Sequence, residues 1–259
     1  MNKNHIGTTS ANGFTFLSFK ERFATFERLG FNSIMLWWGE GEKETRIDRV
    51  ILAKEHNLQI ENVHADMEYS NSLWNPGTHG DQKIQEHIES VKDCATHGIR
   101  RMVIHLTNGD TPPEISDVGL KRIEMLIECA IKYDVTLAIE NVRTDKHIKY
   151  MLDNYKDKHV AFCYDTGHAN LWCKDTDWLS LYADRLAAVH LHDNNGKEDE
   201  HTFPLTGTIN WADVMQKISK SPYDGCLALE TEYTGNENIE ELENFLRTSY
   251  QSGCNLTLL

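Results

Sequence analysis

The sequence predicts an α/β fold, a (βα)8 TIM barrel formed by a single domain over residues 1–259. Three observations lead to this prediction. Short apolar runs alternate with amphipathic stretches along the whole chain. Eight such units in 259 residues average about 32 residues each, and barrels of this kind typically have roughly 250 residues. No linker-like or low-complexity tract interrupts the chain, so no domain boundary is expected.

The apolar runs have the character of buried parallel strands. They are short, rich in β-branched and aromatic residues, and mostly do not alternate with polar residues, as expected when both faces of a strand are covered. They lie at residues 5–10, 34–38, 58–65, 102–106, 136–141, 160–165, 187–193 and 226–232. An open doubly wound sheet would show the same alternation. No GxGxxG or P-loop motif follows any run, which favours the barrel.

The stretches between these runs have helical periodicity. Residues 18–29 place three phenylalanines on one face and begin with Ser18, a residue type that caps helices. The other expected helices lie at residues 43–56, 82–97, 118–132, 146–155, 175–185, 211–220 and 238–251.

Composition excludes several classes of protein. The chain has 26 Lys and Arg against 40 Asp and Glu, a formal net charge of −14, which argues against nucleic acid held by general electrostatic attraction. No apolar run approaches the roughly 18 residues of a membrane span, and the first residues contain no apolar signal-peptide core. The six cysteines form no CxxC pair, so we expect reduced thiols and a cytoplasmic protein.

Six of the apolar runs carry a histidine or a carboxylate at their C-terminal ends. Such groups are costly to bury unless they are paired, hydrogen-bonded or bound to metal. In a barrel these strand ends converge on one mouth, where barrel active sites lie. The six residues are His64, His105, Glu140, Asp165, His190 and Glu230.

This set of side chains suits a divalent metal. Three imidazoles and three carboxylates are ligands for Zn²⁺, Mn²⁺ or Co²⁺, and a carboxylate can bridge two ions. Three loop residues, His168, Asp199 and His201, are further candidates. Any one of the nine could be an ordinary structural residue, but packing alone does not explain the whole set. We expect one to three divalent ions per chain, with zinc favoured and manganese or cobalt as alternatives.

The motifs around these residues resemble the xylose-isomerase-like TIM barrels, the superfamily of endonuclease IV and of sugar isomerases and epimerases. They occur in the family's order over about two thirds of the chain, and YDTGHAN and HLHDNNGKEDEH are the most specific. The matching stretches are NVHAD (62–66), VIHLTNG (103–109), AIEN (138–141), YDTGHAN (164–170), VHLHDNNGKEDEH (189–201), GTINW (207–211) and LALETE (227–232).

The resemblance implies metal-binding roles for all nine candidates. In an endonuclease IV-like site, His64, His105 and a bridging Glu140 would hold one ion. Glu140, Asp165, His190 and Glu230 would hold a second. His168, Asp199 and His201 would hold a third. The epimerase-like branch shares only the second set.

One loop of this sequence departs from the family pattern. Leu205 and Thr206 stand where the family commonly has glycine and glutamate. The shape of this loop, and the occupancy of the third metal site, therefore stay open.

The reaction predicted first is a metal-dependent isomerisation or epimerisation of a sugar or keto-polyol. Glu140 and Glu230 would transfer the proton, and the metal would stabilise the enediolate. The same ligands would also serve an endonuclease IV-like phosphodiester hydrolase, or a dehydratase of a keto-cyclitol or dehydroshikimate-like substrate. A degenerate barrel that only binds sugar or metal is the non-enzymatic alternative.

The charge around the predicted mouth favours a small sugar-like substrate over DNA. The eight strand-to-helix loops contain sixteen Asp and Glu against five Lys and Arg: Lys43, Arg143, Lys146, Lys174 and Lys197. No membrane partner is expected, and the oligomeric state is open.

Three residues near the mouth are candidates for substrate binding: Trp37, Arg143 and His192. Glu40 is a further candidate for substrate contact. Residues 66–81 are expected to form either a lid that carries Tyr69 or Trp74 into the site, or an ordinary surface loop.

Overall fold

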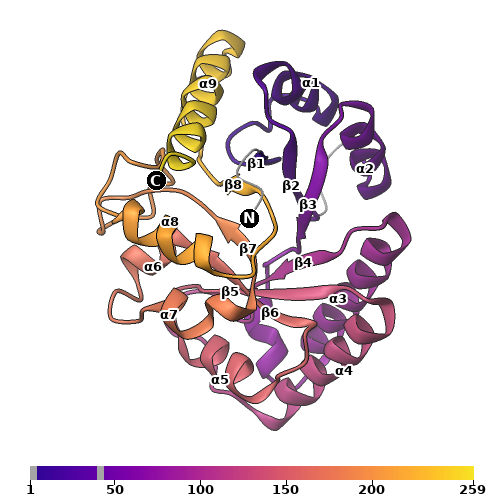
Figure 1. Cartoon of the computed structure of the whole chain (residues 1–259). Helices are drawn as coiled ribbons and strands as arrows, with labels where there is room; N and C mark the ends of the chain where they lie inside the picture. Colours follow the sequence, from indigo (N-terminus) through magenta and orange to yellow (C-terminus); the bar gives the residue numbers. More distant parts are fainter. Residues whose placement is uncertain (1–4, 40–43) are drawn as a thin grey trace.

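The computed structural model describes residues 5–39 and 44–259, and they form the predicted barrel (Figure 1). Eight parallel strands lie in the order β7-β6-β5-β4-β3-β2-β1-β8. A parallel bridge between Leu191, just after β7, and Leu229 in β8 closes the barrel. The strands are β1 (Ile6–Thr9), β2 (Ser33–Trp37), β3 (Gln59–His64), β4 (Arg101–Ile104), β5 (Thr136–Glu140), β6 (Val160–Asp165), β7 (Leu186–His190) and β8 (Leu227–Leu229).

Helices surround the strands, as Figure 1 shows. They are α1 (Phe19–Leu29), α2 (Arg46–Glu55), α3 (Thr78–His97), α4 (Asp117–Tyr133), α5 (Lys146–Asn154), α6 (Thr166–Leu171), α7 (Trp178–Tyr182), α8 (Trp211–Lys220) and α9 (Ile239–Leu256), with 3-10 turns at Ser70–Trp74 and Ala183–Arg185.

The first helix illustrates how local sequence sets the element boundaries. The Ser18 hydroxyl accepts a hydrogen bond from the Glu21 N–H, and the Glu21 carboxylate accepts one from the Ser18 N–H at 2.9 Å. This reciprocal arrangement satisfies backbone donors that the first turn leaves free. Gly30 ends the helix at φ 100, a left-handed conformation that glycine adopts without steric cost.

The inside of the barrel is filled by small side chains beneath the mouth. Val103, Ala138, Cys163 and Ala188 are fully buried and pack together as a separate cluster. Each stands two residues before a predicted metal ligand, on the same side of its strand, because strand side chains alternate. This layer therefore forms the floor on which the site lies.

All eight predicted strands and eight predicted helical regions are confirmed, although several boundaries differ and one helix was not predicted. Helix α3 begins at Thr78 rather than at residue 82, and α9 continues to Leu256. The short helix α6 lies between the run at 160–165 and the helix expected at 175–185, where no helix is predicted. The physical reason is the Asp165 carboxylate, which accepts a hydrogen bond from the His168 N–H at 2.6 Å and caps that helix.

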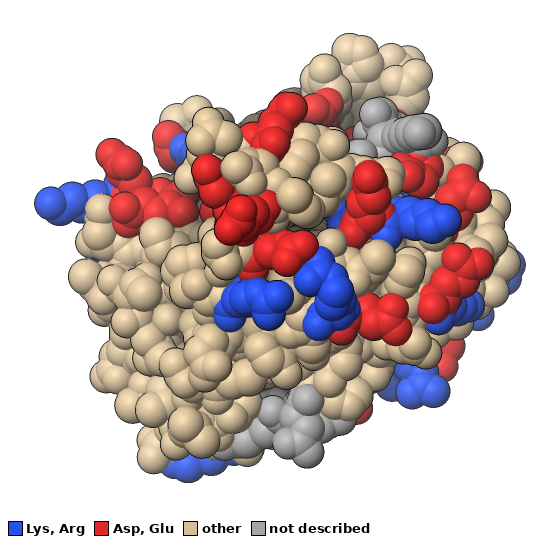
Figure 2. Space-filling view, turned by 90° about the horizontal axis from the view of Figure 1, so that it is seen from above, with Lys and Arg blue, Asp and Glu red and all other residues tan. Residues whose placement is uncertain are grey.

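The surface and the thiols also agree with the composition. In Figure 2 acidic side chains spread over the face seen from above, with basic ones between them, in keeping with the net charge of −14. All six cysteines are free. Among the helices in the described part of the chain, none combines the length and apolar character that a membrane crossing needs.

Candidate metal centre

The strand ends bring the predicted ligands together at one end of the barrel. His64, Glu140, Asp165 and His190 are the last residues of β3, β5, β6 and β7. The other two, His105 and Glu230, directly follow the ends of β4 and β8.

Glu140 stands at the centre of this group. Its Oε2 lies 3.3 Å from His64 Nε2, 3.1 Å from His105 Nε2 and 3.1 Å from His190 Nδ1. Its Oε1 lies 3.1 Å from His168 Nδ1. In a tetrahedral zinc site with bonds of about 2.0–2.1 Å, neighbouring ligand atoms are about 3.3 Å apart. Distances of this size occur between ligands that share a cation, as they do in direct imidazole–carboxylate contacts.

The imidazoles give an independent test of whether a cation fits. His105 Nε2 and His190 Nδ1 are buried and close to carboxylate oxygens, yet neither makes a hydrogen bond of acceptable geometry. Buried polar atoms without partners are costly. Lone pairs that converge on one point from different strands are expected at a metal site. The donor set of imidazole and carboxylate fits a divalent ion of the zinc or manganese type.

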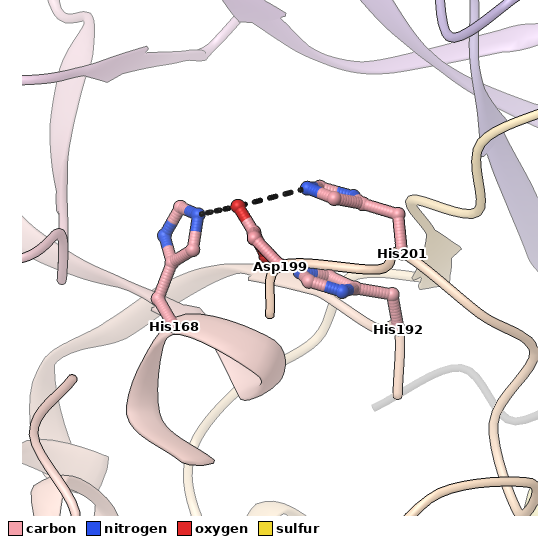
Figure 3. A group of neighbouring side chains, drawn as sticks. All are labelled: His168, His192, Asp199 and His201. Atoms are coloured by element: carbon pink, nitrogen blue, oxygen red, sulfur yellow. Dashed lines mark ion pairs between the residues drawn. The ribbon is translucent and has the colours of Figure 1, made fainter. Parts of the chain in front are cut away.

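A second group lies beside the first, on the side of α6. His168, His192, Asp199 and His201 offer ligand atoms that all lie within 4.8 Å of one another. Asp199 points between two imidazoles (Figure 3): its Oδ2 lies 3.6 Å from His168 Nε2 and 3.5 Å from His201 Nε2. His201 is oriented by a hydrogen bond of its Nδ1 with the Glu230 carbonyl oxygen at 2.7 Å. The three loop candidates thus meet in space, as the resemblance implies.

The charges in the cluster depend on one another. Burial alone would raise the pKa of the Glu140 carboxyl, but the charges of His105 and His190 hold it well below its usual value. Burial would lower the pKa of His201, yet Asp199 raises it to about 9. The lowered pKa values of Glu140, Glu230 and Asp199 keep these carboxyl groups ionised, so they need nearby positive charge. A divalent ion would supply this charge and displace protons from the imidazoles.

A cavity of about 220 Å³ opens above these side chains. Seven of the nine predicted ligands line it, whereas Asp165 and His190 lie fully buried. The remaining lining residues are Thr9, Ala11, Asn12, Met35, Trp37, Met67 and Glu232. Of these seven residues, the sequence predicts only Trp37 as part of the site. The sequence around the other six does not distinguish them from ordinary loop and strand residues.

The three predicted substrate-binding residues have different positions. Trp37 lines the cavity, with its ring centre 5.7 Å from that of His64. Arg143 is 42% exposed and donates to Asp110 at 3.0 Å, while its guanidinium lies 4.6 Å from the centre of the Trp172 ring.

His192, the third of them, is completely buried. Its Nε2 lies 3.0 Å from Asp165 Oδ1, and its ring stacks on that of His201 at 3.8 Å. A Cβ at Gly167 would lie 2.0 Å from this ring, so only glycine leaves room for it.

The segment 66–81 lies against the barrel rather than forming an irregular loop throughout. It contains the 3-10 turn and the first turn of α3. Trp74 is buried and donates from Nε1 to the Leu106 carbonyl at 2.7 Å, so its ring is held in the protein core. Tyr69 is 77% exposed. Met67 is the residue of this segment that reaches the cavity. Glu40 and Lys43 lie outside the described residues.

Comparison with known proteins identifies the family. A model described as xylose isomerase-like TIM barrel matches residues 23–249. The chain belongs to this family. The resemblance seen in the motifs is thereby confirmed, and the family placement covers most of the barrel.

Relatives in sequence are distant. An uncharacterized protein of Methanocaldococcus jannaschii is 28% identical over 139 residues, covering 49% of this chain and 46% of that protein. Inosose dehydratase of Bacillus velezensis is 25% identical over 111 residues, covering 35% of this chain and 37% of that protein. The chain thus spans about half or less of the length of these two relatives.

Solved structures match over nearly the whole chain. A D-psicose 3-epimerase from Clostridium cellulolyticum H10, solved with D-tagatose, has a TM-score of 0.79 at 12% identity and covers 98% of this chain and 99% of its own. A D-tagatose 3-epimerase-like protein has a TM-score of 0.76 at 19% identity, covering 98% and 100%. The IOLI protein with a bound zinc atom has a TM-score of 0.76 at 14% identity, covering 98% of each chain. At these identities the likeness establishes the fold.

Proposed function

We propose that this protein is a metal-dependent isomerase or epimerase of a sugar or keto-polyol. One observation carries the proposal: a single oxygen of Glu140 lies within 3.3 Å of imidazole nitrogens from three different strands, at the base of a cavity of about 220 Å³. Such a cavity accommodates a monosaccharide-sized molecule. The printed names of the structural neighbours, several of them sugar 3-epimerases, support the same class of reaction.

The proposed metal site is the set Glu140, Asp165, His190 and Glu230. A divalent ion held there, zinc or manganese, supplies Lewis-acid stabilisation of negative charge on neighbouring substrate oxygens. His192 keeps Asp165 in place through its Nε2, and the Asn141 side chain bonds the Asp165 backbone at both its N–H and its carbonyl, each at 2.8 Å.

Glu140 and Glu230 are proposed to move the proton. They come from β5 and from the end of β8, so they approach a bound substrate from different directions. Both line the cavity, and their carboxyl pKa values are lowered: burial opposes this, but nearby histidines outweigh it. One carboxylate removes the proton from the carbon next to the substrate carbonyl and becomes a carboxylic acid. This acid can return the same proton to the adjacent carbon, or the other carboxyl group, after taking up a proton from water, can deliver it to the opposite face.

A dehydratase is the second candidate, because one of the relatives is named inosose dehydratase. Its first step would be the same proton removal, with a hydroxide leaving afterwards. Hydrolysis of abasic DNA is disfavoured by the loop charges. Arg143 and Lys146 are paired with Asp110 and Glu114, and Lys174 donates to a backbone carbonyl, so these three cations of the predicted mouth are already engaged.

Deuterium incorporation distinguishes these reactions. Protein loaded with Mn²⁺, Zn²⁺ or Co²⁺ is incubated in D₂O with a panel of ketoses and inososes, and the products are examined by NMR and mass spectrometry. We expect exchange at one carbon of one substrate. Glu140→Gln and Glu230→Gln should abolish it, whereas Glu198→Gln, an exposed carboxylate of the β7–α8 connection, should not.

Three other results would redirect the proposal. Formation of a product that has lost one water identifies the dehydratase. Cleavage of an abasic-site duplex at the rate of dedicated repair enzymes identifies the hydrolase. Absence of exchange with every ketose and inosose, in folded and metal-loaded protein, would exclude the isomerase and epimerase reactions on these substrates.

A further inference from the structure

Two polar residues line the cavity without being predicted metal ligands. They are Asn12, from the β1–α1 connection, and Glu232, from the β8–α9 connection. In a closed barrel of eight strands, β1 and β8 are neighbours and stand opposite β5 and β4. Asn12 and Glu232 therefore face His105 and Glu140 across the cavity, where they would meet substrate atoms that the metal does not hold.

Backbone contacts hold these two residues in place. The Tyr233 N–H donates to the Asn12 carbonyl at 3.3 Å, which joins the two connections. The Glu232 N–H donates to the His201 carbonyl at 3.0 Å, which joins Glu232 to the metal-ligand loop. At Gly13, φ is 77 and an added Cβ would lie 1.9 Å from the Tyr233 carbonyl oxygen. Only glycine allows this close approach of the two connections that carry Asn12 and Glu232.

Their side chains are free to bind a ligand. Within residues 5–39 and 44–259, neither the Asn12 amide nor the Glu232 carboxylate has a hydrogen-bond or ion-pair partner, although both line the cavity. An amide donates and accepts, and a carboxylate accepts from two hydroxyl groups at once. Groups of this kind suit the hydroxyls of a polyol.

We propose that Asn12 and Glu232 determine substrate specificity by binding substrate hydroxyl groups that the metal does not hold, and that the charge of Glu232 excludes substrates phosphorylated at those positions. The inference rests on the proposed function, since it concerns another part of the same substrate. Glu232 adds a negative charge to a cavity that already contains Asp199, Glu140 and Glu230. A divalent ion would offset the last two, whereas Glu232 would face the ligand directly.

Binding measurements with matched sugar pairs test this. Manganese-loaded protein is titrated calorimetrically with D-tagatose and D-tagatose 6-phosphate, and with D-fructose and D-fructose 6-phosphate. We expect at least one free ketose to bind at least tenfold more tightly than its ester. Glu232→Gln should reduce the ratio of the two affinities at least threefold and weaken the binding of the free ketose. Asn12→Ala should weaken the binding of both ketose and ester and leave the ratio of their affinities unchanged. Raising the salt concentration should reduce the preference of the native protein for free ketose over ester, because salt screens the repulsion between Glu232 and the phosphate. It should have little effect on the preference of Glu232→Gln.

Glu237→Gln is the matched control, because Glu237 is an exposed carboxylate of the same connection that stands outside the cavity lining. It should leave both affinities unchanged. Equal binding of ketose and ester by the native protein would overturn the inference. So would failure of both free ketoses to bind, or a Glu232→Gln variant that behaves like Glu237→Gln. Discrimination in binding without deuterium exchange would instead refute the proposed reaction and leave this inference standing.

Discussion

Gly13→Ala should destabilise the protein far more than a chemically identical change at Gly109. Both glycines have φ 77, so an alanine at either position must adopt the same unfavourable left-handed φ. Around Gly109 an added Cβ meets nothing within 4 Å, whereas at Gly13 it would lie 1.9 Å from the Tyr233 carbonyl oxygen and 2.8 Å from the carbonyl carbon. The pair of variants therefore separates the backbone cost from the collision.

The expected magnitudes follow from the contacts. A left-handed conformation destabilises a non-glycine residue by about 1–2 kcal/mol. Alanine also reduces the conformational entropy of the unfolded chain, which stabilises the folded state by about 0.4–1 kcal/mol. Gly109→Ala should thus destabilise the protein by about 0–1.6 kcal/mol. At Gly13 one backbone must also move by about 1.5 Å to reach ordinary contact distance. Overpacking adds about 1–3 kcal/mol, and loss of the Tyr233–Asn12 hydrogen bond adds about 1 kcal/mol. We expect a total of about 2–5.6 kcal/mol.

Urea unfolding of both variants, with the metal content held equal, measures the difference. The transition midpoint should fall for Gly13→Ala and change little for Gly109→Ala, with similar slopes. Because the collision also moves Asn12, sugar binding should weaken in Gly13→Ala and stay unchanged in Gly109→Ala. Equal stability of the two variants would refute the close approach of the β1–α1 and β8–α9 connections.

Other predictions concern the metal centre. Elemental analysis of purified protein should find one to three divalent ions per chain, and their removal by a chelator should lower the melting temperature, because binding energy stabilises only the folded state. Glu140→Gln should reduce turnover by at least a thousandfold and lower the metal content. Glu230→Gln should reduce turnover similarly, and near-normal kcat in either variant would refute the proton-transfer roles. His201→Ala should remove one ion per chain if the group of His168, Asp199 and His201 binds metal, and unchanged metal content would show that it does not.

The metal-site candidates could be predicted because burying a polar or charged side chain carries a large desolvation penalty. Asp165 and His190 are fully buried at strand ends, where an unpaired polar group costs several kcal/mol. A sequence can keep such residues only when something satisfies them, so their positions at the ends of apolar runs are informative. The candidate ligands are expected to lie close together because a closed barrel brings the C-terminal ends of all its strands to one mouth.

Asn12 and Glu232 could not be predicted by the same reasoning. They lie in connections at the mouth, where a polar side chain costs nothing in water and so gives no signal. Their relation depends on the contact between Gly13 and Tyr233, which are 220 positions apart in sequence. Glycine in a loop is common, and only the structure shows that this one is required. The short helix α6 was missed for a related reason, since Asp165 was considered as a ligand and not also as a helix cap.

The loop that departs from the family pattern shows how a turn can form without the residue types that the family commonly has there. Leu205 replaces a glycine, yet it adopts φ 74, the left-handed region that favours glycine. The Thr206 hydroxyl and N–H both donate to the Phe203 carbonyl, at 2.6 Å and 3.2 Å, and these bonds hold the turn that Leu205 would otherwise resist. The backbone of this loop therefore adopts at Leu205 a conformation that glycine favours. Asp199 and His201, which precede the turn, lie close to His168.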